Sequence, residues 1–108
     1  MAYLTHAPIE RPDRLEAAGA RTGASVQFVG IVRGDDDGAR VDALDYETYE
    51  PMAERMIGQL VAEAQARWGL QRVMVQHRVG RVPAGEVAVV IRVEASHRNE
   101  AFEACRFL

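Results

Sequence analysis

Residues 87–108 read Val87-Ala-Val-Val-Ile-Arg-Val-Glu-Ala-Ser-His-Arg-Asn-Glu-Ala-Phe-Glu-Ala-Cys-Arg-Phe-Leu108, and their hydrophobic pattern changes period half-way along. Up to Ala95, every second side chain is apolar, which predicts a strand with one buried face. Ser96 then supplies a residue type that caps helix N-termini. Beyond it, apolar residues recur at helical spacing, at Ala101, Phe102, Cys105 and Leu108. The segment therefore predicts a strand that leads directly into a helix.

The junction of that strand and helix carries two basic side chains. His97 and Arg98 would lie in the first helical turn, where backbone N–H groups are unpaired and the helix dipole is positive. Acidic residues are usually favoured at such a position, because they complement the dipole. Two basic or donor side chains there indicate that an anion binds at this junction.

The rest of the chain shows the same two periodicities. Strands are predicted over 24–33, 40–49, 73–79 and 86–95, a long helix over 50–68 and a short helix over 13–20. A turn predicted over 80–85 would join the last two strands as an antiparallel hairpin. Pro51 suits the first turn of the long helix, and Gly69 suits its C-terminal cap. The long helix carries an apolar stripe that is interpreted as core, formed by Met52, Met56, Ile57, Leu60, Val61, Ala64 and Trp68. The order β-β-α-β-β-α predicts one α+β domain over 1–108, with helices packed on a mostly antiparallel sheet.

Composition narrows the possible functions. The formal charge of the 108 residues is −3, and all 13 basic residues are arginines. This balance argues against non-specific binding to nucleic acid or to an anionic membrane surface. The single cysteine fits a reducing compartment, the first twelve residues have no apolar signal-peptide core, and no apolar run could span a bilayer. A cytoplasmic protein is therefore expected.

Candidate metal and nucleophile sites are weak. The segment Gly34-Asp-Asp-Asp-Gly38 is interpreted as a solvated acidic turn, because three successive side chains cannot all point at one metal ion. Cys105 falls on the apolar stripe of the last helix, where a thiol behaves as a small hydrophobic group. No spacing typical of zinc sites or phosphate loops is present, and no metal or cofactor is expected.

Three further residues are candidates for weaker reasons. Arg33 ends the first strand beside a glycine loop, where a long side chain could reach a ligand. His77 shares a strand face with Val73 and Val75, so a satisfied core histidine is favoured over a catalyst. Arg78 points to the other face and is either a surface residue or part of an anion pocket. Gly30 predicts a bulge or a close backbone approach in the first strand.

Six segments occur in the order and spacing of one known family. Together they resemble the large, catalytic subunit of molybdopterin synthase, over a match that runs from about Ala24 to the end of the chain. The segments are Phe28-Val-Gly-Ile-Val-Arg33, Leu44-Asp-Tyr-Glu-Thr-Tyr-Glu-Pro-Met-Ala-Glu54, Arg67-Trp-Gly-Leu70, Gln76-His-Arg-Val-Gly80, Pro83-Ala-Gly-Glu86 and Ala95-Ser-His-Arg-Asn-Glu-Ala-Phe-Glu-Ala-Cys105.

This resemblance implies an α/β hammerhead fold and a sulfur-transfer reaction of molybdenum cofactor biosynthesis. The family converts cyclic pyranopterin monophosphate into the dithiolene molybdopterin. Sulfur arrives as a thiocarboxylate on the C-terminal Gly-Gly of a small ubiquitin-like subunit, and the large subunits form a homodimer within a heterotetramer. By the same resemblance, Ile31, Val32 and Arg33 would line the substrate site, and His97 and Arg98 would bind the pterin phosphate. The independent anion prediction for His97 and Arg98 agrees with this role.

One departure from the family pattern affects the expected activity. Relatives continue past the last helix into a segment with two active-site lysines, whereas this sequence has no lysine and stops at Leu108. The catalytic residues are therefore unassigned, and the C-terminal catalytic segment is expected to be missing from the sequence. The main alternative is a non-catalytic scaffold that docks the small subunit. An unrelated anion-binding domain of the same topology is a third possibility.

Overall fold

The computed structural model describes residues 2–10 and 19–108, and its strands and helices form the predicted α+β architecture. About half of the polypeptide lies in one long helix, one shorter helix and three long strands, and the other strands have two to four residues. The elements are β1 Leu4–Thr5, β2 Ala24–Ile31, β3 Asp35–Asp36, β4 Ala39–Arg40, β5 Ala43–Tyr46, α1 Glu50–Trp68, β6 Arg72–Arg78, β7 Gly80–Pro83, β8 Val87–Ala95 and α2 Arg98–Phe107.

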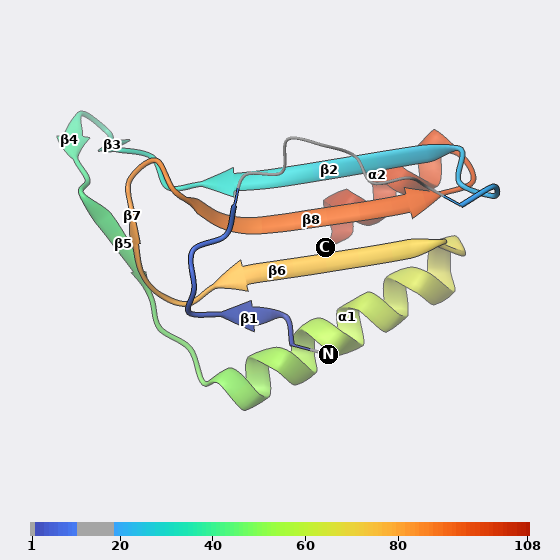
Figure 1. Ribbon diagram of the computed structural model, residues 1–108, viewed down its shortest axis with the longest axis horizontal. Coiled ribbons are helices and arrows are strands. Elements are labelled where there is room, and N and C mark those ends of the chain that lie inside the picture. Colours follow the sequence, from blue (N-terminus) through green and yellow to red (C-terminus); the bar gives the residue numbers. More distant parts are fainter. Residues whose placement is uncertain (1, 11–18) are drawn as a thin grey trace.

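The main sheet has four strands in the order β1-β6-β8-β2 (Figure 1). β8 lies at its centre and pairs antiparallel with both β6 and β2, whereas β1 runs parallel to β6. This arrangement confirms the mostly antiparallel sheet and the pairing of the last two long strands. β5 and β7 form a separate two-stranded sheet at one end, next to the small β3–β4 hairpin (Figure 1).

Both helices contribute to a core on one face of the main sheet. Ile91 and Val93 of β8 pack with Ala104 and Cys105 of α2, and Trp68 at the end of α1 packs against the same cluster. The opposite face of β8 is also buried, because Arg92 is only 5% exposed and Glu94 only 3%. The prediction that β8 is half-buried is therefore wrong. Its polar side chains form an ion pair instead of facing water.

The long helix begins and ends as its sequence indicated. Pro51 lies in its first turn, and Gly69 takes the left-handed conformation at φ 59° that a C-terminal cap requires. The interpretation of its apolar stripe as core is only partly right. Val61 and Ala64 are buried, but Met52 and Met56 are more than half exposed. Leu60 is 39% exposed, so one half of the stripe faces outward.

Several strand boundaries differ from the sequence prediction because short strands depend on distant partners. The predicted strand 40–49 is divided into β4 and β5, and the predicted turn 80–85 begins with β7, which pairs with β5. The predicted strands 24–33 and 73–79 correspond to β2 and β6. The short helix predicted over 13–20 lies largely outside the described residues. Gly30 does mark a bulge, since the register between β2 and β8 shifts there.

The start of α2 also differs from its prediction. Ser96 is not the N-cap; His97 occupies that position, and its side chain makes no capping hydrogen bond. The Ser96 hydroxyl instead accepts a hydrogen bond from the Gln71 side chain at 3.2 Å. Ala101 and Cys105 are buried as predicted, whereas Phe102 is 61% exposed. Within the part of the chain that the structure describes, neither helix is long and apolar enough to cross a membrane.

Candidate functional site

A cavity lies where β2 ends. Its volume is about 250 Å³, and its walls include all three residues that the sequence predicted at this place, Ile31, Val32 and Arg33. Ile31 is 40% exposed and Arg33 is exposed, so both side chains can reach a ligand. Val32 is only 2% exposed and packs with Val82 and Ala88, so its side chain forms part of the wall beneath the surface.

The backbone around Val32 is fixed by the turn that precedes β8. The Val32 N–H donates to the Glu86 carbonyl at 3.1 Å, and the Val32 carbonyl accepts from the Gly85 N–H at 2.8 Å. Gly85 has a φ of 88°, a conformation that glycine adopts without steric cost. These two hydrogen bonds hold the end of β2 against the turn, and they set the direction in which Arg33 leaves the sheet.

Arg78 holds the same turn in place through its side-chain hydrogen bonds. Its side chain is nearly buried and donates to a Glu86 carboxylate oxygen at 2.6 Å and to the Arg81 carbonyl at 3.2 Å. It is therefore neither a surface residue nor part of the wall of this cavity. Arg78 thus binds Arg81 and Glu86, which lie on the two sides of the turn that positions Val32.

The cavity also contains residues that the sequence did not indicate as functional. Asp35, Asp36 and Tyr46 line it together with Val41 and Leu44. The aspartates belong to the segment interpreted as a solvated turn, and they are exposed as expected. Asp35 and Asp36 follow Arg33 closely in the sequence, and the pairing of β3 with β4 fixes the backbone that carries them. Because a local pattern does not report that pairing, the signal in the sequence was limited to the acidic run itself.

His77 acts as a support for one wall of the cavity. Its ring is half-buried and meets the Tyr46 ring edge-on, with 5.1 Å between the ring centroids. Its Nδ1 lies 2.8 Å from the Arg78 carbonyl, which can only accept, so Nδ1 carries the hydrogen. His77 is therefore a half-buried, hydrogen-bonded histidine, which is the interpretation that the sequence favoured.

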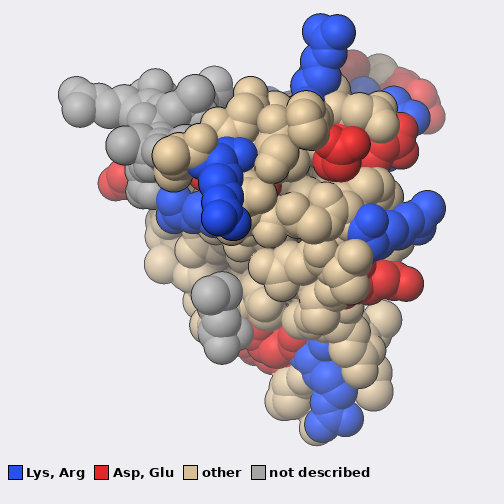
Figure 2. Space-filling view, turned by 90° about the vertical axis from the view of Figure 1, so that its right-hand side faces the viewer, with Lys and Arg blue, Asp and Glu red and all other residues tan. Residues whose placement is uncertain are grey.

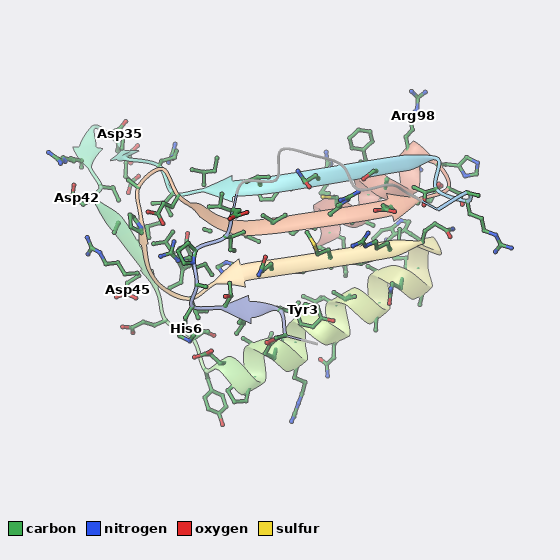
Figure 3. All side chains as sticks on the ribbon, in the orientation of Figure 1. Tyr3, His6, Asp35, Asp42, Asp45 and Arg98 are labelled. Atoms are coloured by element: carbon green, nitrogen blue, oxygen red, sulfur yellow. The ribbon has the colours of Figure 1, made fainter. Side chains whose placement is uncertain are left out.

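His97 and Arg98 lie at the other end of the sheet. The His97 side chain is 81% exposed, and its Nδ1 is 3.6 Å from a Glu100 carboxylate oxygen. Arg98 is the first residue of α2, and its side chain points outward past β2 (Figure 3). Arginine side chains stand at several separate places on this end of the molecule, with uncharged and acidic surface between them (Figure 2). They do not merge into one basic patch.

The two predicted halves of the site are far apart within one chain. Ala24 at the start of β2 pairs with Ala95, next to the His97–Arg98 junction, whereas Ile31 at its end pairs with Val87. At about 3.3 Å for each residue of a strand, the length of β2 separates the halves by roughly 25 Å. Figure 3 shows Asp35 and Arg98 at opposite ends of the sheet accordingly. One copy of the chain therefore does not bring Arg33 and Arg98 to the same ligand.

Among residues 2–10 and 19–108, no three histidine, cysteine, aspartate or glutamate side chains are grouped closely enough to hold a metal ion. The one thiol, Cys105, is buried in the core between α2 and the sheet. Burial raises the pKa of the Cys105 thiol above its ordinary value, which keeps the sulfur protonated and a poor nucleophile.

Comparisons with known proteins agree on one family. The family model described as MoaE protein matches residues 4–108. A molybdopterin synthase catalytic subunit from Thermoplasma volcanium is 45% identical over 100 residues, which cover 93% of this chain and 67% of that protein. One from Nostoc sp. is 38% identical over 106 residues, which cover 96% of this chain and 64% of that protein. The chain thus spans about two thirds of the length of these curated relatives.

Solved structures give the same result. The crystal structure of molybdopterin synthase from Staphylococcus aureus superposes with a TM-score of 0.86 at 31% identity, and the match covers 98% of this chain and 78% of that one. The molybdopterin biosynthesis MoaE protein from Burkholderia ambifaria gives a TM-score of 0.70 at 38% identity, over 80% of this chain and 55% of that one.

Proposed function

Because this chain belongs to the MoaE protein family, we propose that it acts in the cytoplasm as the catalytic subunit of a molybdopterin synthase. In this function, sulfur passes from the thiocarboxylated C-terminus of a small ubiquitin-like subunit to cyclic pyranopterin monophosphate, and two transfers produce the dithiolene of molybdopterin. Two copies of the chain form a homodimer, and each copy binds one small subunit through its Gly-Gly tail, which gives a heterotetramer.

One coincidence carries the proposal. The family match extends over residues 4–108, and a cavity lies at the three residues, Ile31, Val32 and Arg33, that the resemblance assigns to the substrate. The arginine can hold a phosphate or another anionic group through its planar pair of donors. The carboxylates of Asp35 and Asp36 are acceptors suited to the N–H groups of a pterin ring.

The side chains of this chain would position the substrate and balance its charge. The sulfur of the carrier is the nucleophile, so the subunit needs to hold the pterin carbon and the thiocarboxylate close together. Arginine and histidine stabilise the negative charge of the phosphate. Arg33, His97 and Arg98 are the candidates for these functions within residues 2–10 and 19–108.

Purified chain can test the proposal in a sulfur-transfer assay with a thiocarboxylated small subunit and the pyranopterin. Arg33→Ala and Arg98→Ala are each expected to weaken binding of the phosphate-bearing substrate by about 10- to 100-fold, because a charge-assisted hydrogen bond contributes about 1.5–3 kcal/mol. Arg55→Ala is the matched control, since Arg55 is an exposed arginine on α1. Substrate affinity unchanged in both pocket variants would contradict the assignment. Binding of the small subunit without turnover would favour the scaffold alternative.

A further inference from the structure

Tyr46 lies in the cavity at the end of β2, and the proposed function gives it no role. It is the last residue of β5 and lines the cavity together with Leu44, two residues before it. Side chains two residues apart in a strand point to the same face. Asp45 between them is exposed and points away from the molecule (Figure 3). The alternation of β5 thus turns the Tyr46 side chain toward the cavity.

Neighbouring side chains hold the ring of Tyr46 in place. The ring packs against the buried cluster of Val32, Val82 and Ala88. The His77 ring meets it nearly at a right angle, at 76° between the ring planes. His77 is itself fixed by the hydrogen bond of its Nδ1 to a backbone carbonyl at 2.8 Å. A ring that is packed against fixed neighbours keeps its hydroxyl in one position, which is what preorganised binding of a ligand requires.

The hydroxyl of Tyr46 has no partner in the protein. Within residues 2–10 and 19–108 it forms no hydrogen bond, and it is not sealed from solvent. Gly80 lies directly opposite Tyr46 on β7 and offers no side-chain acceptor. A tyrosine hydroxyl whose ring is packed usually finds a partner. The polar end of this side chain is therefore left to water or to a ligand in the cavity.

Two of the described side chains that line the cavity can donate a hydrogen bond, those of Arg33 and Tyr46. The others are either apolar or, at Asp35 and Asp36, carboxylates that only accept when they are ionised. An anionic oxygen needs donors and is repelled by carboxylates. The favoured position for an anionic group in the cavity is therefore between Arg33 and the Tyr46 hydroxyl, away from the two aspartates.

The volume of the cavity limits what can bind between these two donors. At about 250 Å³, it lies below the range of about 300–1,000 Å³ that is typical of sites enclosing a whole small molecule. The cavity therefore accepts one part of a larger substrate, such as a phosphate with the atoms next to it. Hydrogen bonds from a hydroxyl to an ionised oxygen are short and strong, so a hydroxyl is a suitable second donor beside a guanidinium.

We propose that Tyr46 is a further substrate-binding residue, whose hydroxyl donates a hydrogen bond to an oxygen of the same phosphate that the Arg33 guanidinium holds. The pairing of the two donors rests on the cavity and its lining. The identity of the substrate that carries the phosphate, a pyranopterin, rests in addition on the proposed function.

Tyr46→Phe tests this role because it deletes the hydroxyl and keeps the ring with its packing. Calorimetric titration should show the affinities for the pyranopterin and for inorganic phosphate both falling about tenfold, which corresponds to about 1.4 kcal/mol. The melting temperature should stay native, since the hydroxyl has no protein partner to lose. Tyr49→Phe is the matched control: it makes the same change at a side chain that is 71% exposed and outside the cavity lining, and both affinities should stay native. A lower melting temperature of Tyr46→Phe with native affinities would make the hydroxyl structural and overturn the proposal.

The two ligands separate the role of Tyr46 from the proposed function. If Tyr46→Phe weakens binding of the pyranopterin but not of phosphate, the hydroxyl binds another part of the substrate, and its pairing with Arg33 is refuted. If Tyr46→Phe binds both ligands like the native chain, the role of Tyr46 is refuted and the proposed function stands. If the native chain binds phosphate more tightly than Tyr46→Phe does but does not bind the pyranopterin, the proposed function fails and the anion site of Arg33 and Tyr46 stands. A native chain that binds neither ligand would overturn both.

Discussion

Replacing Glu94 by glutamine should destabilise the fold far more than the same substitution at a surface position. The Glu94 carboxylate is 3.2 Å from an Arg92 guanidinium nitrogen, and the two side chains are only 4% and 6% exposed. Arg72 approaches the same carboxylate at 3.9 Å, with its side chain 45% exposed. Glu94→Gln keeps the size of the side chain and one acceptor oxygen, but it removes the negative charge that faces two arginines.

The size of the expected stability loss follows from the burial of the Arg92–Glu94 ion pair. Breaking a buried ion pair by removing one charge costs about 3–5 kcal/mol, because the remaining charge is left in a poorly solvating environment. The retained acceptor and the half-exposed Arg72 place Glu94→Gln near the lower limit, at about 3 kcal/mol. For a domain of this size, about 4–8 °C is lost for each kcal/mol, so the melting temperature should fall by roughly 12–24 °C.

Glu50→Gln is a closely matched control. Glu50 pairs with His6 at 3.1 Å, almost the same distance, but its side chain is 46% exposed and that of His6 is 69% exposed. Exposed pairs contribute between about 0 and 1 kcal/mol, so this variant should stay close to the native stability. Urea unfolding followed by the fluorescence of Trp68, which packs against the core, would measure both changes.

A third variant separates the charge from the packing. The double substitution Arg92→Met/Glu94→Leu removes both buried charges and should recover a large part of the stability lost in Glu94→Gln. The reasoning would be refuted if Glu94→Gln and Glu50→Gln differed by less than about 1 kcal/mol. Burial would then not determine the strength of these pairs.

Arg78→Met removes the hydrogen bonds to Glu86 and to the Arg81 carbonyl and should lower the free energy of unfolding by about 2 kcal/mol. Arg81→Met, at an exposed side chain, should lower it by less than about 0.5 kcal/mol. Equal losses of the two variants in urea unfolding would contradict this expectation. Gly69→Ala should cost about 1 kcal/mol, because alanine is strained at the φ of 59° that caps α1, and an unchanged urea midpoint would show that the cap relaxes freely. Burial raises the pKa of the Cys105 thiol, so the unfolded chain loses this proton first as the pH rises. The contribution of the protonated Cys105 thiol to the free energy of unfolding is therefore fully present below about pH 9 and is lost above it. Relative to Cys105→Ala, the native chain should lose stability with increasing pH in that range, and parallel pH profiles would contradict the expectation.

Much of the fold could be read from local pattern. The alternation in 87–95 and the helical spacing after it are properties of consecutive residues, and β8 and α2 formed there. Pro51 and Gly69 define the ends of α1 for equally local reasons, since one fits a first helical turn and the other a left-handed cap. Gly30 likewise marks the bulge in β2. Such features depend on backbone dihedrals, which the residue itself restricts.

Features that depend on distant partners were not predictable in this way. The local pattern predicts a turn where β7 lies, because the strand character of β7 comes from its pairing with β5, more than thirty residues earlier. Arg92 and Glu94 look like a solvent-facing pair in the strand pattern, but tertiary packing buries both of them. Met52 and Met56 look like core, although tertiary packing leaves both of them exposed. A hydrophobic period reports which side chains share a face, and it does not report what covers that face.

The candidate site shows the same difference between local features and features that depend on distant partners. The sequence by itself determined which residues have the chemistry for an anion, because the type and order of Arg33, His97 and Arg98 are local facts. Only the tertiary structure decided where they lie: the antiparallel register of β2 on β8 sends Arg33 to one end of the sheet and the His97–Arg98 junction to the other. Register is set by pairing between segments some sixty residues apart. The separation of the two halves therefore became visible only when the strands were placed side by side.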